Sequence, residues 1–390
     1  MVEWKKLGEV CSRITDGSHF SPKSVESGYF MPSVKDMTYD GFNFDSCKQI
    51  TEEDYKSLVS SGCKPQIGDV LIAKDGSMLK YVFPIKENKD IVVLSSIAIL
   101  TPCKSIINSS YLSHYLRQDF IKEKTIREFS SKGGVPRIIL KNFKKIIIPI
   151  PSLEEQNRIV GILDTFTYAF ENLKQQIAYR KKQLEQYRNE LLDLEGHEGV
   201  SMRPLGDLCE IIRGNGVQKT DFTEEGVGCI HYGQIYTHYG LFTYTTNKFV
   251  SEATAAKAKK ASKGDIIMTS TSENVEDVCK SVAYLGEDDI AVSSHALILK
   301  HNLDPKYLAH CTATYNFFKQ KYKLAHGAKV VEIKPEEVAK IKIPVVAKPG
   351  QSLIVFILDK FEAIIANLEK QLELRQKQYE YYRNQLLTFA

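Results

Sequence analysis

Residues 159–191 read IVGILDTFTYAFENLKQQIAYRKKQLEQYRNEL, and this stretch decides the fold. Its apolar residues recur in alternating steps of four and three, which is the heptad spacing of a helix that packs along another helix. Arg180 is the one charged member of the series. The series consists of Ile159, Leu163, Phe166, Phe170, Leu173, Ile177, Arg180, Leu184, Tyr187 and Leu191.

The same series returns near the end of the chain, with Arg375 at the position of Arg180. One interpretation is that each apolar stripe lies on the core of its own domain. Because the series is long and occurs twice, it favours a pair of long helices that meet along these side chains. The second series consists of Ile354, Leu358, Phe361, Ile365, Leu368, Leu372, Arg375, Tyr379, Tyr382 and Leu386.

The helix pair belongs to a repeat of about 195 residues that runs through the whole chain. Seven short segments return in the same order with nearly constant spacing, which indicates an internal duplication. The matched segments are 7–11 and 205–209, 68–71 and 264–267, 93–96 and 291–294, 111–114 and 307–310, 145–149 and 340–344, 162–164 and 357–359, and 187–189 and 382–384.

The repeat predicts an α+β chain in which two similar mixed α/β domains, residues 1–153 and 196–349, are separated by long helices, residues 154–195 and 350–390. A helix of about 40 residues is about 60 Å long. A compact domain of about 150 residues has a radius of gyration near 15 Å, so its two ends cannot lie that far apart. We therefore expect an antiparallel coiled coil, pseudo-twofold symmetry, and a C-terminus close to the first domain.

Within the domains, β-branched runs predict strands and amphipathic stretches predict helices. The expected strands are residues 90–100, 144–150 and 290–300, and the expected helices are residues 110–129 and 305–324.

Composition excludes several classes of function. The net charge is 52 − 48 = +4, and the excess lies in the globular parts, with 22 − 17 = +5 in residues 1–153 and 19 − 17 = +2 in residues 201–349. The sequence contains no run of 18 apolar residues, which a membrane-spanning helix would need. The charged N-terminus does not resemble an export signal, so we expect a cytoplasmic protein. The eight cysteines form no CxxC pair, and we expect no metal site.

The sequence carries no strong catalytic signature, and we expect no catalytic residues. The sequence contains no GxxxxGK[ST] phosphate-binding loop and no HExxH metal motif. Glu332-Ile333-Lys334 has the E-x-K form of some nucleases, but its repeat counterpart at residues 137–139 lacks the acid. Ser293-Ser294-His295 is best interpreted as part of an apolar strand, because its counterpart at residues 95–97 lacks the histidine.

The duplicated order of domains and helices, together with the motifs in residues 14–23, 212–237, 148–156 and 343–351, resembles the specificity subunit (S subunit) of type I restriction-modification enzymes. Residues 14–23, ITDGSHFSPK, are similar to the family's early loop, and residues 212–237 are similar to a second variant of that loop. Residues 148–156, IPIPSLEEQ, are similar to its strand-to-helix junction, and residues 343–351 keep the Ile-Pro and the Gln but lose the Glu. The resemblance covers the whole chain in the order domain, helix, domain, helix.

The resemblance implies a non-catalytic subunit with two target recognition domains that read two unlike half-sites of double-stranded DNA. It further implies that two methyltransferase subunits dock on the chain to methylate adenine, and that restriction subunits make the complex an ATP-dependent endonuclease. S-adenosylmethionine, ATP and Mg²⁺ would then belong to the partner subunits, with no cofactor in this chain. The paired helices would set the gap between the half-sites.

Contacts with DNA phosphates need Lys, Arg or exposed N–H groups, and contacts with bases need Arg, Lys, Asn, Gln or His side chains that reach a groove edge. Loops carry such residues more often than core strands do. The alternative for each is a solvated surface residue. We expect His114 and His310, which recur in an apolar helical context, to be packed in the core. The DNA-contact candidates are His19, Lys23, Lys35, Lys74, Lys80, Lys132 and Arg137 in the first domain and Arg213, Lys219, His231, Gln234, Ser270, His326 and Lys329 in the second.

Two other functions stay open at this point. A protein-interaction scaffold with two globular heads would show no salt-dependent DNA binding. A fragment of a fused restriction enzyme would show catalytic activity as a pure protein.

Overall fold

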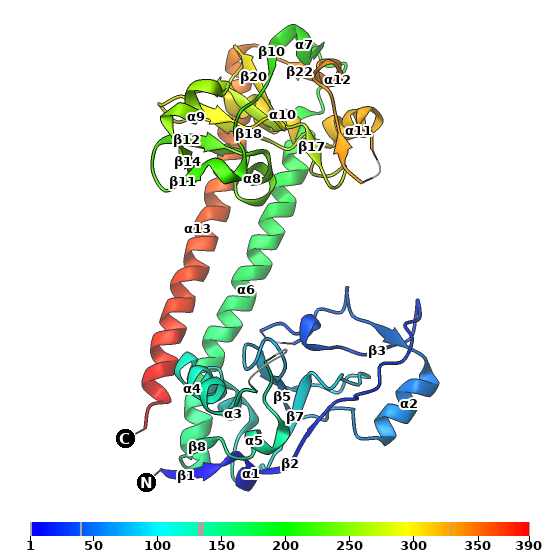
Figure 1. Cartoon of the computed structure of the whole chain (residues 1–390), viewed down its shortest axis with the longest axis vertical. Coiled ribbons are helices and arrows are strands. Elements are labelled where there is room, and N and C mark those ends of the chain that lie inside the picture. Colours follow the sequence, from blue (N-terminus) through cyan, green and yellow to red (C-terminus); the bar gives the residue numbers. More distant parts are fainter. Residues whose placement is uncertain (1, 40, 132–135, 328, 390) are drawn as a thin grey trace. The chain divides into compact units, whose positions relative to one another are not determined.

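The computed structural model describes residues 2–39, 41–131, 136–327 and 329–389. The chain forms two compact units. The first unit contains residues 1–174 and 371–390, and the second contains residues 175–370. Each unit therefore combines one globular part with a segment of both long helices, α6 (Leu153–Leu192) and α13 (Lys348–Leu386) (Figure 1). Among the described residues, no helix is long and apolar enough to cross a membrane.

The first unit is built on an antiparallel sheet with the strand order β2-β7-β5-β6. Its strands are β1 (Glu3–Lys6), β2 (Cys11–Asp16), β3 (Tyr29–Phe30), β4 (Gln49–Ile50), β5 (Val70–Ala73), β6 (Val82–Pro84), β7 (Ile97–Pro102) and β8 (Ile147–Ile150). Its helices are α1 (Leu7–Val10), the 3-10 turn η1 (Val34–Asp36), α2 (Glu52–Ser60), α3 (Ser109–Leu116), α4 (Asp119–Phe129) and α5 (Leu140–Phe143).

The second unit repeats this sheet as β10-β20-β16-β18, extends it with the parallel strand β13, and adds a second sheet of order β11-β14-β12-β19-β15. Its strands are β9 (Ser201–Pro204), β10 (Cys209–Arg213), β11 (Phe222–Thr223), β12 (Val227–Ile230), β13 (Phe242–Thr243), β14 (Lys248–Val250), β15 (Lys260–Ala261), β16 (Ile266–Thr269), β17 (Thr271–Ser272), β18 (Ser281–Tyr284), β19 (Ile290–Val292), β20 (Ala296–His301), β21 (Val331–Glu332) and β22 (Lys342–Val345). Its helices are α7 (Leu205–Leu208), the 3-10 turn η2 (Lys219–Asp221), α8 (Tyr232–Thr237), α9 (Glu252–Lys257), α10 (Pro305–Thr312), α11 (Tyr315–Leu324) and α12 (Pro335–Val338).

Four predicted elements are each broken by a turn. The strand expected at residues 290–300 is two strands in different sheets, because the chain turns where the N–H of Ala296 donates to the carbonyl of Ser293 at 3.1 Å. The strand expected at residues 90–100 begins only at Ile97, after the corresponding turn. The helices expected at residues 110–129 and 305–324 are both split in two, and Thr314 caps the second helix of the latter pair.

The repeated Gly-Asp pair explains how each central strand begins. Gly68 and Gly264 adopt φ values of +93° and +95°, which favour glycine. The next residue closes the turn, since Asp69 accepts a hydrogen bond from the N–H of Gln66, and Asp265 accepts one from Ser262, both at 2.8 Å.

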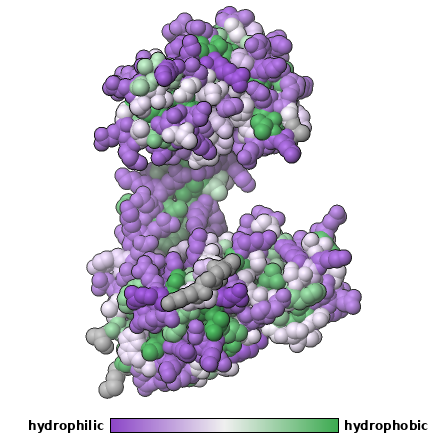
Figure 2. Space-filling model, viewed as in Figure 1, coloured by the Kyte–Doolittle hydropathy of each residue, from purple (hydrophilic) through white to green (hydrophobic). Residues whose placement is uncertain are grey.

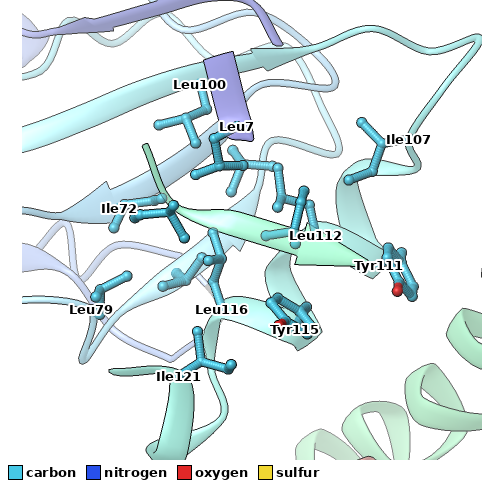
Figure 3. Close-up of a cluster of buried hydrophobic side chains, with 14 of the residues drawn as sticks. Leu7, Ile72, Leu79, Leu100, Ile107, Tyr111, Leu112, Tyr115, Leu116 and Ile121 are labelled. Carbon is cyan, nitrogen blue, oxygen red and sulfur yellow. The ribbon is translucent and has the colours of Figure 1, made fainter. Parts of the chain in front are cut away.

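The core of the first unit joins the sheet, α3 and the start of α6. Leu7, Ile72, Leu100 and Leu112 belong to one cluster of buried side chains (Figure 3). Ile159 and Leu163 of α6 belong to the same cluster and are fully buried. The first part of the heptad stripe therefore does lie on the core of its own domain, as the alternative interpretation held.

Farther along, the stripe packs on the other long helix, and the pairing is antiparallel in each unit. In the first unit the rings of Phe166 and Tyr382 lie 5.6 Å apart, as do those of Phe170 and Tyr379. In the second unit Lys181 pairs with Glu369 at 2.8 Å, and Tyr187 stacks on Phe361 at 4.9 Å. The predicted interface residues that are buried are Ile159, Leu163, Phe170, Ile177, Leu184, Ile354, Leu358, Ile365 and Tyr379. Phe166, Leu173, Leu191, Phe361, Leu368, Leu372 and Leu386 are half-buried.

The fold class predicted from the repeat is thus confirmed, with mixed α/β domains and two long helices that pair antiparallel. The C-terminus also returns to the first domain as expected, because Leu387 joins the core of that unit. The four residue ranges proposed for the domains and helices stay a prediction.

Candidate nucleic-acid interface

A cluster of charged side chains gathers at the end of strand β2 in the first unit. The carboxylate of Asp16 lies 3.2 Å from the Lys74 ammonium and 3.4 Å from Nε2 of His19. The side chain of Lys74 is only 7% exposed, whereas that of His19 is 77% exposed. Lys74 is therefore held inside as a counter-ion, and His19 is the group that faces solvent.

Main-chain hydrogen bonds bring the Arg137 segment to the same cluster. The N–H of Ile138 donates to the carbonyl of Lys74 at 3.0 Å, and the N–H of Gly76 donates to that of Pro136 at 2.8 Å. These bonds place the exposed Arg137 beside the loop that follows β5. Lys132, another predicted contact, lies outside the described residues.

The turn between residues 93 and 97 joins one further candidate to this cluster. The hydroxyl of Ser96 accepts from the N–H of Val34 in η1 at 3.1 Å, and the carbonyl of Ser96 accepts from the N–H of Lys74 at 3.0 Å. The exposed Lys35 is therefore carried near the cluster. Lys23 is exposed on another loop. Lys80 is exposed farther along the loop that carries Lys74, and its ammonium lies 5.2 Å from the centre of the Tyr81 ring.

The second unit has a corresponding cluster around Arg213, at the end of β10. Nη2 of Arg213 donates to Glu332 and Nε donates to the carbonyl of Ser294, both at 3.2 Å. Glu332 and His326 exchange backbone hydrogen bonds of 2.8 and 2.9 Å, so the exposed His326 lies beside the same ion pair. Lys329 is exposed in the same loop.

Several candidates of the second unit are enclosed rather than open. Ser270 is 1% exposed, and its N–H and carbonyl hydrogen-bond to the backbone of His295 and Ile333 at 3.0 Å. The ring of His231 is buried and accepts a hydrogen bond from the N–H of Gly233 at 3.2 Å. Burial, with Lys219 and His295 nearby, lowers the pKa of His231 to about 4, so the ring carries no charge at neutral pH.

Gln234 acts within the fold as well. Its side-chain carbonyl accepts from the N–H of His231 at 2.7 Å, and its amide donates to Asn247. Lys219 is exposed on η2. The geometry thus brings together His19, Lys35, Lys74 and Arg137 in one unit and Arg213, Ser270, His326 and Lys329 in the other. DNA contact by any of them stays a prediction.

Sequence reasoning missed Asp16, Glu332 and His295. The sequence analysis considered Asp16 only as part of a loop motif and Glu332 only as part of a nuclease-like triplet, whereas each holds a cation in place. His295 was treated as part of a strand, but it is exposed on the turn between β19 and β20. Ser293 has a structural role, because its hydroxyl accepts from the N–H of Tyr232 at 2.9 Å.

His114 and His310 are buried, as predicted, and they face the long helices. The His114 ring lies 3.0 Å from Asp164 of α6 and 2.9 Å from the hydroxyl of Tyr379 in α13. Nδ1 of His310 accepts a hydrogen bond from Nε of Arg188 at 3.3 Å. These contacts tie each domain to its helices and leave the loop clusters as the candidate interface.

Exposed polar side chains dominate the face shown in Figure 2, with smaller hydrophobic patches between them. Among the described residues, no group of three or more His, Cys, Asp or Glu side chains is placed to hold a metal ion. The exposed charged groups of the two clusters are suited to polar recognition.

Known proteins are similar to this chain over most of its length, and the similarity repeats in its two halves. A family model described as the type I restriction modification DNA specificity domain matches residues 1–180 and again residues 197–375. The specificity subunit of the type I restriction enzyme EcoR124I/EcoR124II from Escherichia coli is 31% identical over 283 residues, 66% of this chain and 67% of that protein. A putative type I restriction enzyme specificity subunit from Haemophilus influenzae is 27% identical over 100% of this chain and 96% of its own length.

Solved structures share the fold. A chain from a study of complex assembly and conformational transition of the type I R-M system matches with a TM-score of 0.60 at 17% identity, covering 99% of this chain and 97% of its own. A type I restriction-modification S subunit from M. genitalium matches with a TM-score of 0.54 at 14% identity, covering 100% of this chain and 97% of its own.

The chain therefore has two similar domains, two paired long helices and a cluster of charged loop residues in each domain. The chain belongs to the type I restriction modification DNA specificity family, which confirms the resemblance found in its sequence.

Proposed function

We propose that this chain selects the DNA target of a type I restriction-modification complex and that each unit reads one half of a bipartite site. One observation carries the proposal: the same scaffold occurs twice, with unlike side chains at equivalent loop positions. Asp16 and Lys74 of the first cluster correspond to Arg213 and Ser270 of the second. Two similar domains with different contact groups are suited to two half-sites of different sequence.

The chemistry would be supplied by partner subunits. Two methyltransferase subunits would bring S-adenosylmethionine and methylate adenine, and restriction subunits would bring ATP and Mg²⁺ for DNA cleavage. The membership of the family and the described assembly of a structural relative support this arrangement. The paired helices α6 and α13 would fix the gap between the half-sites, since a long helix pair is a stiff spacer.

The contacts with DNA would be divided between two kinds of residue. The exposed cations Lys23, Lys35, Lys80, Lys219 and Lys329 would bind phosphates, which position the protein without reading sequence. His19, Arg137, Arg213 and His326 would approach base edges from the two clusters. The enclosed Lys74, His231 and Ser270, together with the half-buried Gln234, would support the loops that carry these groups.

Methylation mapping tests this proposal. Genomic DNA from cells that express the chain with its methyltransferase subunits would be compared with DNA from cells that lack the chain. We expect a new adenine mark with two unlike half-sites around a fixed gap. If the complex of this chain with its methyltransferase subunits forms and no new adenine mark appears, the proposed function is wrong.

A further inference from the structure

Two equivalent positions in the clusters carry opposite charges. Strand β2 ends at Asp16 followed by Gly17, and strand β10 ends at Arg213 followed by Gly214. The two glycine N–H groups bond to equivalent strands, since Gly17 donates to Ile97 at 3.2 Å and Gly214 to Ala296 at 2.9 Å. The two residues before the glycines are therefore structural counterparts.

Close packing fixes both positions. A Cβ atom on Gly17 would collide with the carbonyl oxygen of Val93, and one on Gly214 would collide with that of Ser293. The strand end is therefore held against the same turn in both units, which leaves the side chain before the glycine as the variable element.

The counter-ions of the two side chains come from different loops. Asp16 is 12% exposed and pairs with the enclosed Lys74, from the loop after β5. Arg213 is 48% exposed and pairs with Glu332 of β21, whose own side chain is 45% exposed. The first unit thus buries an acid where the second unit presents a cation.

The Arg213 guanidinium is anchored at one edge. Its Nε and one Nη2 hydrogen donate to Ser294 and Glu332, both at 3.2 Å. A guanidinium has five N–H groups, so these two contacts leave three N–H groups in an oriented, half-exposed plane. Paired N–H groups of this kind match the O6 and N7 acceptors of guanine in the major groove.

We propose that this position determines specificity, and that Arg213 reads the edge of a guanine in the half-site recognised by the second unit. The inference rests on the proposed function and adds a residue and a base to it. Glu332 is a positioning residue that sets the plane of the guanidinium. The first unit has no arginine at this position, so its half-site is read differently.

The test uses the complete complex with its methyltransferase subunits and maps adenine methylation for Arg213→Gln, Glu332→Gln and wild type. Arg203→Gln is the matched control, because Arg203 is an exposed arginine of the same unit on β9. For Arg213→Gln we expect discrimination at one guanine-containing base pair to fall by roughly 5- to 150-fold, the range of one lost paired contact. Glu332→Gln should relax the same base pair to a smaller extent.

The other half-site and the gap should stay unchanged in both variants, and Arg203→Gln should give the wild-type mark. An unchanged motif in Arg213→Gln, relaxation in both half-sites, or loss of every mark from a folded and assembled complex would each overturn the inference. None of these results affects the proposed function, which depends on the wild-type chain giving a bipartite mark.

Discussion

The side-chain carbonyl of Gln156 accepts a hydrogen bond from the N–H of Asn108 at 2.8 Å, and its amide donates to the carbonyl of Pro151 at 2.9 Å. Gln351 makes the equivalent bonds to Asp304 and Val346, both at 2.9 Å. Each glutamine thus joins the start of a long helix to the loop before α3 or α10. This explains why the junction keeps its Gln in both repeats and loses the Glu in one, since Glu155 forms an ion pair with Arg158 at the surface.

We expect Gln156→Leu to lower the free energy of unfolding by about 1–3 kcal/mol, because it leaves buried backbone groups without partners. Thermal unfolding of the full chain measures the effect. Glu155→Gln is the control and should cost less than about 1 kcal/mol, since it removes only a surface ion pair. Equal shifts for the two variants would contradict this account of the junction.

Gly17→Ala should destabilise the first unit by about 1–3 kcal/mol, because the added methyl group collides with the carbonyl of Val93 and the strand must shift. Gly41→Ala is the control, since a Cβ there meets no atom within 4 Å. Chemical denaturation compares the two variants. A Gly17→Ala protein as stable as wild type would show that the strand end is not packed as described.

The stability of the second unit should depend on pH through His310. Burial, with Arg188 and Lys306 nearby, lowers the pKa of His310 to about 3, against about 6.5 in an unfolded chain. Between these values the unfolded chain binds a proton that the folded chain does not. The free energy of unfolding should therefore fall as pH drops below about 6.5, by about 1.4 kcal/mol for each pH unit.

Denaturation at a series of pH values between neutral and mildly acidic, for wild type and His310→Gln, measures this contribution. We expect the variant to lose less stability on acidification than wild type does. His197→Gln, at an exposed position, should behave as wild type. The same pH dependence in all three proteins would refute the assignment to His310.

Lys329→Ala should weaken DNA binding by the assembled complex to a similar extent for all sequences. Each phosphate contact contributes about 0.9 to the slope of log K against log salt concentration, so the slope should become shallower by about that amount. Lys263→Ala is the control. Lys263 is an exposed lysine on the turn before β16, and it forms an ion pair with Glu287. If Lys329→Ala changed the target motif, the assignment of Lys329 to a phosphate contact would be contradicted.

Periodicity predicted the long helices because their heptad series is a local pattern that repeats along one face of each helix for many turns. It failed at residues 117–118 and 313–314, where apolar spacing continues across a helix break. Those breaks are set by capping: the Thr314 hydroxyl, for example, accepts from the N–H of Phe317.

The candidate site was harder to predict, because its pairs join distant parts of the chain. From the sequence, Lys74 was expected to be an exposed loop lysine. The fold instead buries its side chain and pairs it with Asp16, which lies far earlier in the sequence. Arg213 and Glu332 are likewise paired only by the fold. Sequence alone could not show which of these cations is enclosed by the fold and which is open to a ligand.

The central claim is that each unit reads its own half-site, and the most direct test is a chain that carries residues 196–390 twice in place of the natural pair. Expressed with the methyltransferase subunits, it should produce an adenine mark with two copies of one wild-type half-site and none of the other. A mark that still contains both wild-type half-sites would contradict the claim.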